Sequence, residues 1–288
     1  MTSKEWYSRG AYFTYNQFKT FYRREGKGPV LLCIHGFPSS SWDFGSIWSE
    51  LTQKFDVIAI DLIGLGKSSK PKQPLTVNLQ ADQIERLLTT LQIESVHLLT
   101  HDLGDTVAQE LLARHMDRSA KVNWLSCIFL NGGIFPETHQ PLLIQKLLIS
   151  PMGKFLSPFM SEKTLKKNMT NIFSKEHPPS NQFIKGTWQL ICHGNGKTMI
   201  PRLIRYMKER STFRERWVNP LERNMIPLRL INGIQDPISG GHAADRFAEV
   251  VPNADIVRLK NAGHYPHIET PMEVMEAFIA FHDTLDSA

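Results

Sequence analysis

The stretch that decides the fold is Ser95-Val96-His97-Leu98-Leu99-Thr100-His101-Asp102-Leu103-Gly104-Asp105. Its apolar first half predicts a short strand, its glycine-containing end predicts a tight turn, and residues 106–112 continue as a helix. A strand, a tight turn and a helix around a reactive side chain form a nucleophile elbow, where serine is usual. Here that residue is Asp102, which presents a carboxylate. The structural alternative is that Asp102 only caps the following helix.

The exchange of serine for aspartate changes which bonds the protein can cleave. A carboxylate that attacks a saturated carbon forms an alkyl ester on its own side chain, and water can hydrolyse that ester. A serine that attacked the same carbon would leave an ether, which water does not cleave. An aspartate that attacked an acyl carbon would form an anhydride, which is a poorer route. Asp102 therefore predicts carbon–halogen bonds and epoxide C–O bonds as targets.

Hydrolysis of such an ester needs a histidine that takes a proton from water and an acid that orients the histidine. On a fold with this elbow, the order along the chain is nucleophile, acid, histidine. Asp236 closely follows a predicted strand at residues 228–233, and His264 follows another at 255–259. We predict the triad Asp102, Asp236 and His264, with His267 as the second choice of base. The structural alternatives are a turn aspartate and an ordinary loop histidine.

The rest of the chain alternates predicted strands and helices. Besides the elbow, strands are predicted at residues 11–15, 19–23, 30–34, 57–60, 124–130, 228–233 and 255–259, and helices at 44–55, 80–91 and 272–285. This alternation predicts an α/β fold with a mostly parallel sheet covered by helices on both faces. Between residues 134 and 217 the strand pattern stops, and mostly helical sequence predicts an inserted cap over the carboxyl ends of the strands. We thus predict a two-part core, residues 1–133 and 218–288, and a helical cap, 134–217.

The composition of the 288-residue chain, 41% hydrophobic, predicts a soluble globular protein. It has no apolar run of about 18 residues that could cross a membrane, and its N-terminus lacks the apolar stretch of a secretory signal. The cysteines, Cys33, Cys127 and Cys192, are odd in number and widely spaced. Cys33 and Cys127 lie in apolar strand-like runs, so we predict buried free thiols and a cytoplasmic location.

Positive charge is concentrated in the predicted cap. Residues 134–217 contain fourteen lysines and arginines against five glutamates, whereas the whole chain has a net charge of +5. The simpler interpretation is a solvated helical surface, and the other is attraction of anionic substrates or weak contact with an anionic membrane surface. The aromatic interleaving of nucleic-acid modules is absent, so no nucleic-acid partner is predicted. The sequence predicts no particular oligomeric state.

With these residues in place, the chain resembles the α/β-hydrolase superfamily over nearly its whole length. The aspartate elbow is similar to that of the epoxide hydrolase and haloalkane dehalogenase branch. The segments that carry the likeness are His35-Gly36-Phe37-Pro38 and His101-Asp102-Leu103-Gly104. The resemblance implies that the backbone N–H groups of Phe37 and Leu103 form an oxyanion hole for the ester-cleaving step. Chemistry of this kind needs no metal and no cofactor.

Two departures from that branch bear on the substrate. Haloalkane dehalogenases typically hold the halide with a tryptophan after the nucleophile, and they have an asparagine after the His-Gly pair. Leu103 and Phe37 stand at these positions without a side-chain donor, which disfavours dehalogenation. Epoxide hydrolases use two cap tyrosines to protonate the opening ring, whereas Tyr206 is the only tyrosine in residues 134–217. One donor is therefore missing or replaced.

The substrate-binding residues that we predict are Tyr206, Trp42 and Trp188. Tyr206 is the best available acid, and His139, His193 or Trp188 could replace the missing donor. Packing inside the cap is the alternative for Tyr206, and core packing is the alternative for the tryptophans.

The sequence favours an epoxide hydrolase-like enzyme that acts on a small apolar electrophile. Haloalkane dehalogenation and the hydrolysis of lipid or other carboxylic esters are alternative activities. A non-catalytic binding protein on a hydrolase fold is the alternative from a different class of function.

Overall fold

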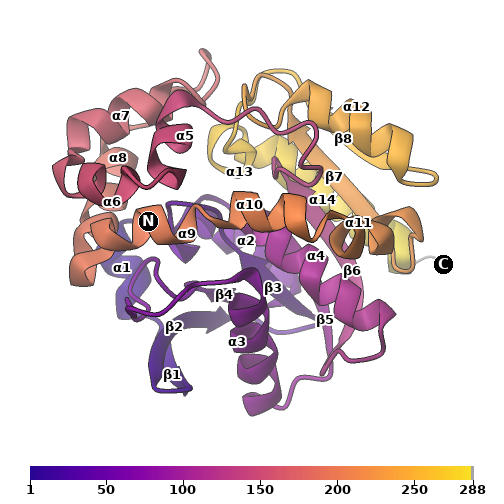
Figure 1. Cartoon of the computed structure of the whole chain (residues 1–288). Helices are drawn as coiled ribbons and strands as arrows, with labels where there is room; N and C mark the ends of the chain where they lie inside the picture. Colours follow the sequence, from indigo (N-terminus) through magenta and orange to yellow (C-terminus); the bar gives the residue numbers. More distant parts are fainter. Residues whose placement is uncertain (287–288) are drawn as a thin grey trace.

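A computed structural model describes residues 1–286 and shows an eight-stranded sheet (Figure 1). In spatial order the strands are β1 (Ala11–Tyr15), β2 (Phe18–Glu25), β4 (Asp56–Ile60), β3 (Val30–Ile34), β5 (Ser95–His101), β6 (Asn123–Leu130), β7 (Leu228–Gly233) and β8 (Asp255–Leu259). β1 and β2 pair antiparallel, as do β2 and β4, and all further pairs are parallel. The predicted α/β fold with a mostly parallel sheet is confirmed.

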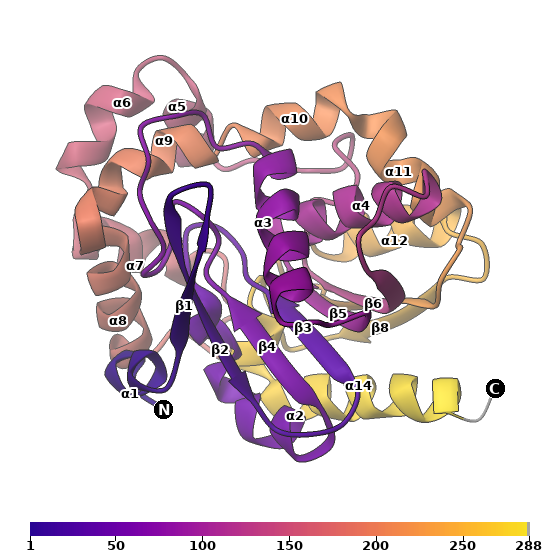
Figure 2. The ribbon, with the colours of Figure 1, turned by 90° about the horizontal axis from the view of Figure 1, so that it is seen from below.

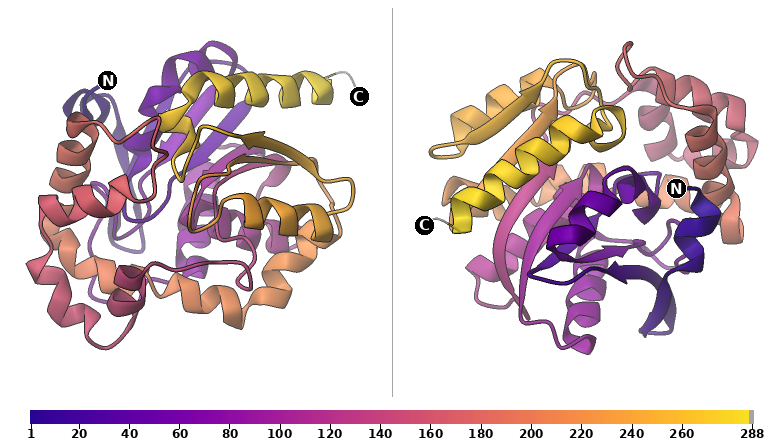
Figure 3. Two further views of the ribbon diagram at one scale, coloured as in Figure 1. Left: turned by 90° about the horizontal axis from the view of Figure 1, so that it is seen from above. Right: turned by 180° about the vertical axis from the view of Figure 1, so that it is seen from behind.

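Helices cover both faces of this sheet, because its parallel strands are apolar on both sides. α2 (Trp48–Lys54) and α14 (Pro271–Asp286) lie on one face (Figure 2). The other face is covered by α3 (Val77–Thr90), α4 (Leu103–Met116) and α12 (Gly241–Val250). Figure 3 shows α14 from above and from behind, on the face opposite α12.

The helix boundaries differ from the sequence prediction where the apolar period is short or interrupted. The predicted helix at 44–55 is a 3-10 helix, Ser41–Ser46, followed by α2. A short N-terminal helix α1 (Ser3–Ser8), which the apolar pattern does not indicate, is capped by Thr2. α4 begins at Leu103, directly after the elbow residue, rather than at residue 106.

The elbow is a strained turn between β5 and α4. Asp102 has φ +48° and ψ −103°, a conformation that costs an L-residue about 1–3 kcal/mol. Gly104 permits the close approach of α4 to the sheet, because a Cβ there would lie 2.1 Å from the Ile34 carbonyl oxygen. The turn therefore presents Asp102 at the carboxyl edge of the sheet, next to the segment that follows β3.

The segment between β6 and β7, which contains the predicted cap at residues 134–217, is helical. Its helices are α5 (Leu143–Ile149), α6 (Gly153–Leu156), α7 (Glu162–Thr170), α8 (Asn181–Cys192), α9 (Ile200–Leu203), α10 (Tyr206–Thr212) and α11 (Arg214–Glu222). α11 packs on α4, where the Trp217 indole donates a 2.8 Å hydrogen bond to Glu110. The predicted cap boundary at residue 217 therefore falls inside a helix that is attached to the core.

Cys33 and Cys127 are free and buried, as predicted, and Cys192 is free and exposed. Burial raises the pKa of the Cys33 and Cys127 thiols, so neither is a ready nucleophile. Across residues 1–286, no helix combines the length and apolar character needed to span a bilayer.

Candidate active site

Asp102 lies where the elbow, cap helix α10 and the segment after β3 meet. The side chain is buried and makes no capping hydrogen bond to α4, so it does not act as the structural cap. Its Oδ2 accepts a 2.9 Å hydrogen bond from the Phe37 N–H, and its Oδ1 accepts one of 3.1 Å from the Tyr206 hydroxyl. The backbone amide thus contacts Oδ2, and the cap phenol lies closer to Oδ1 than to Oδ2, from which it is 3.5 Å away.

Arg210, a buried arginine of α10, also contacts Asp102. Its Nη2 donates to the Asp102 backbone carbonyl at 3.2 Å and lies 3.6 Å from Asp102 Oδ1. Its Nε donates to the Thr106 hydroxyl at 2.6 Å, which fixes the guanidinium plane. Burial raises the pKa of Asp102, but the charges of His264 and Arg210 lower it by more. Asp102 is therefore ionised at neutral pH, as a nucleophile must be.

His264 and Asp236 form the hydrogen-bonded pair that ester hydrolysis requires. His264 Nδ1 lies 2.8 Å from Asp236 Oδ2, and both side chains are buried. The same carboxylate accepts hydrogen bonds from the Asn131 amide at 3.1 Å and from the Ser239 hydroxyl at 2.7 Å. Burial lowers the pKa of His264, but the charge and hydrogen bond of Asp236 and the charge of Asp102 raise it to about 9. His264 is therefore mostly protonated at neutral pH before a substrate reacts.

The two backbone groups named for the oxyanion hole flank Asp102. The Phe37 N–H already donates to Oδ2. Leu103 is buried and is the first residue of α4. N–H groups in the first turn of a helix have no partner within the helix, and they carry the positive end of its dipole. Negative charge on Oδ2 would therefore meet the Phe37 N–H, a donor that is fixed before any reaction.

The structure brings Tyr206 to Asp102, but it places the two predicted tryptophans elsewhere. Trp42 donates its indole N–H to the Met1 carbonyl oxygen at 3.2 Å, and its ring stacks on Phe183. Trp188 is half-buried, and the Lys197 ammonium lies 5.7 Å from its ring centroid. These contacts tie Trp42 to the N-terminal segment and Trp188 to the cap. Core and cap packing, the structural alternatives, describe both residues better.

Of the proposed replacements for the missing proton donor, His139 is the one that faces the site. Its ring nitrogens are buried and have no hydrogen-bond partner. Burial and the neighbouring charge of Arg210 lower its pKa to about 3. His139 is thus neutral at physiological pH and can donate one N–H. His193 is exposed, and the charges next to it are those of Lys70 and Lys67.

Asp43, His101 and His267 form another buried polar cluster. Each offers a ligand atom, and these atoms lie within 4.8 Å of one another, so within residues 1–286 this cluster could hold a metal ion. Both ring nitrogens of His267 are without a hydrogen-bond partner. His267 therefore lacks the acid that would orient a base, whereas His264 has it. His101 Nε2 lies 2.8 Å from the His264 backbone oxygen, so the cluster adjoins the candidate site.

Comparison with known proteins agrees with this fold. Residues 31–277 match the model of the Alpha/beta hydrolase family. The chain therefore belongs to the alpha/beta hydrolase family, and its relatives support a hydrolase. It is similar to the mesoderm-specific transcript homolog protein of Bos taurus, with 37% identity over 96% of this chain and 86% of that protein.

Solved structures share the architecture at low identity. A loop variant of haloalkane dehalogenase DbeA from Bradyrhizobium elkanii matches with a TM-score of 0.82 and 19% identity, over 96% of this chain and 97% of that chain. The epoxide hydrolase CorEH matches with a TM-score of 0.75 and 19% identity, over 96% and 99%. At such identities the likeness shows the fold alone, and the chemistry rests on the side chains of this site.

Proposed function

We propose that this hydrolase opens epoxides, with Asp102 as the nucleophile. One observation supports this proposal above all. Asp102 Oδ1 accepts a hydrogen bond from the buried Tyr206 hydroxyl, while Oδ2 accepts one from the Phe37 N–H. A halide leaves without a proton, whereas the oxygen of an opening epoxide needs one. A buried phenol at the attacking oxygen therefore favours an oxygen leaving group, and the side chains of Phe37 and Leu103 offer no halide donor.

In the first step, Asp102 Oδ1 attacks a ring carbon and gives up its hydrogen bond to Tyr206. The ring C–O bond breaks, and the freed oxygen takes the proton of the phenol. Burial and the Asp102 charge raise the pKa of Tyr206, whereas Arg210, 4.6 Å from its ring centroid, lowers it. Ester formation removes the Asp102 charge and leaves the effect of Arg210. The phenol thus becomes more acidic as negative charge develops on the leaving oxygen.

In the second step, His264 takes a proton from water, and the resulting hydroxide attacks the carbonyl carbon of the Asp102 ester. Negative charge develops on Oδ2, which already accepts the Phe37 N–H. Collapse of this intermediate breaks the bond between the carbonyl carbon and Oδ1 and releases a diol. The proton on His264 returns to the Tyr206 phenolate through solvent, so the sum of the two steps is the addition of one water to the epoxide.

The pKa of His264 links the two steps and predicts a pH dependence. The Asp102 charge helps to raise this pKa to about 9, so a neutral ester at Asp102 lowers it. We expect the rate of ester hydrolysis to rise about tenfold per pH unit below that lowered pKa and to level off at or below about pH 9, because only neutral His264 accepts a proton. Ester formation should stay flat from about pH 6 to 9, because the pKa of Asp102 is lowered. Rapid-quench mass spectrometry of single turnovers measures both rates, and a flat hydrolysis rate would exclude His264 as the base.

Intact-mass detection of an ester on Asp102 tests the proposal directly. A His264→Gln variant, incubated with panels of epoxides and haloalkanes, should retain the alkyl group that Asp102 has taken. The mass added to Asp102 identifies the class of electrophile. A folded variant that forms no adduct with any member of either panel would exclude both kinds of alkyl transfer.

The basic cap also carries exposed apolar side chains, and we propose that this surface contacts an anionic membrane. Phe155 and Phe159 are 59% and 86% exposed, and Leu143 is 72% exposed. Lys146 and Lys154 lie in the same short stretch of chain. Exposed aromatic and aliphatic anchors next to lysines are typical of segments that lie in the interface of an anionic bilayer. A solvated surface, the alternative interpretation, does not explain why the anchors cluster.

Flotation with phosphatidylserine-containing vesicles measures this contact. The double variant Phe155→Ser with Phe159→Ser should lower vesicle binding by at least about tenfold, because each buried phenylalanine contributes about 1.5–3 kcal/mol. The control is Met272→Ser on α14, which removes an apolar side chain that is 72% exposed outside the cap. Equal loss in both variants, or no binding by the unaltered protein, would contradict the proposal.

A further inference from the structure

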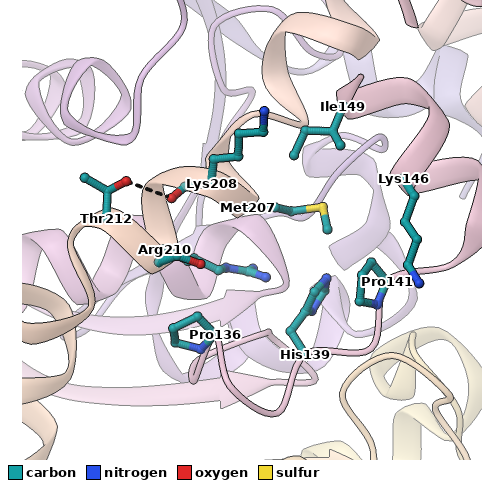
Figure 4. Close-up of a pocket in the computed structure, with 10 residues that line it drawn as sticks. Pro136, His139, Pro141, Lys146, Ile149, Met207, Lys208, Arg210 and Thr212 are labelled. Carbon is teal, nitrogen blue, oxygen red and sulfur yellow. Dashed lines mark hydrogen bonds between the residues drawn. The ribbon is translucent and has the colours of Figure 1, made fainter. Parts of the chain in front are cut away.

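A cavity beside the nucleophile has a cationic lining. It lies between α5, α10 and the segment after β6, and its volume is about 470 Å³. Its lining includes Arg210, His139, Lys146 and Lys208, and no carboxylate among the described residues lines it. Figure 4 shows the side chains of Arg210 and His139 extending toward the same space. A site with this lining attracts an anion.

The inner end of this cavity holds buried donors without partners. Arg210 is 2% exposed, and its Nη1 has no hydrogen-bond partner, although its Nε and Nη2 are both bonded. Both ring nitrogens of His139 are likewise unpartnered. The two groups converge, because a Cβ on Gly133 would lie 2.1 Å from Arg210 Nη1 and 2.7 Å from His139 Nδ1. Unpaired buried donors are costly, so an acceptor group bound here would be favoured.

The proposed reaction changes the charges next to Arg210. In the free protein, the Asp102 carboxylate offsets the charge of Arg210 at 3.6 Å. Attack on carbon converts Asp102 into a neutral ester, and the remaining negative charge lies on the Tyr206 phenolate, whose ring centroid is 4.6 Å from Arg210. Arg210 thereby loses the carboxylate at 3.6 Å, and an anion on Nη1 would pair directly with the guanidinium through the intermediate. Arg210 connects the two positions, with Nη2 on Asp102 and Nη1 free for the ligand.

We infer that the substrate carries a carboxylate that binds Arg210 Nη1 and the His139 N–H in this cavity; this rests on the proposed epoxide-opening function. A carboxylate offers two acceptors to a guanidinium edge, and Arg210 is the buried cation in the lining of this cavity. Lys146 and Lys208 are exposed at the rim, where they draw an anion inward without being buried. A neutral epoxide would leave Arg210 Nη1 and His139 unpaired, so the site discriminates against it.

Two epoxides of matched shape test the inference in the His264→Gln variant. Glycidate carries the carboxylate, and glycidamide replaces it with a neutral amide. Each rate of adduct formation on Asp102 is divided by the rate of the same epoxide with acetate in solution. We expect a ratio at least about tenfold higher for glycidate, and Arg210→Met should abolish this preference. Lys208→Gln, at the exposed rim, should lower the glycidate rate by more than the glycidamide rate.

A binding measurement separates this inference from the proposed reaction. Calorimetric titration of the Asp102→Asn variant with lactate and with lactamide needs no chemistry. Lactate should bind at least about tenfold more tightly than lactamide. His139→Phe should weaken the binding of lactate and not that of lactamide. Equal glycidate and glycidamide ratios would overturn the inference and leave epoxide opening intact. If the Asp102→Asn variant binds lactate but the His264→Gln variant forms no adduct, the carboxylate site is upheld and epoxide opening is refuted. Equal binding of lactate and lactamide would refute the carboxylate site.

Discussion

Replacing His264 with Gln is expected to stop turnover after the first step and to leave the substrate esterified on Asp102. Glutamine cannot take a proton from water, so the ester is cleaved only by the slow, uncatalysed attack of water. Removing the general base of such a unit lowers kcat by about 10³–10⁶-fold. The first step survives because the pKa of Asp102 is lowered, which keeps Asp102 ionised and nucleophilic. Intact mass shows one added substrate per chain, and peptide mapping places it on Asp102.

The matched control for this trap is Asp102→Asn in the same His264→Gln background. An amide does not attack a saturated carbon, so the double variant should show no added mass. Its fold should persist, because the Phe37 N–H can still donate to the side-chain oxygen of the amide that replaces the carboxylate. An adduct that persists in the double variant, or that maps to another residue, would mean that the nucleophile lies elsewhere.

The elbow and the His264–Asp236 pair were predictable because their signals are local or ordered along the chain. The apolar run before Asp102 and the glycine after it indicate a strand and a tight turn, and β5 and α4 meet at that residue. Asp236 and His264 follow β7 and β8, whose carboxyl ends lie at the same edge of a parallel sheet. Their 2.8 Å contact therefore follows from strand order, although they are 28 residues apart.

The cap side of the site could not be predicted in the same way. Which face of α10 meets Asp102 depends on how the cap packs on the core, and no sequence period encodes that. The spacing of four residues between Tyr206 and Arg210 places both on one helix face and was the available signal. An aromatic residue such as Trp42 or Trp188 can line an apolar pocket, but its ring packs equally well in a core, where Trp42 meets Phe183.

Replacing Tyr206 with Phe is expected to slow adduct formation from epoxides by about 10²–10⁴-fold, the usual contribution of a general acid. The same change should leave adduct formation from a matched bromoalkane equal or faster. Bromide needs no proton, and loss of the 3.1 Å hydrogen bond frees Asp102 Oδ1 to attack. The measurement is the rate of mass gain in the His264→Gln background, with one epoxide and one bromoalkane of equal carbon skeleton.

The ratio of the epoxide rate to the bromoalkane rate is the decisive quantity, because a general disturbance of the site changes both rates equally. If Tyr206 only positions Asp102, both electrophiles lose rate together and the ratio stays constant. If Tyr206 donates the proton, the epoxide rate falls relative to the bromoalkane rate by about 10²–10⁴-fold. His139→Phe in the same assay asks whether the buried imidazole supplies the second donor, because its N–H has no other hydrogen-bond partner. A shift with Tyr206→Phe and none with His139→Phe would mean that one phenol suffices for ring opening, and His139 would then be left to bind the substrate.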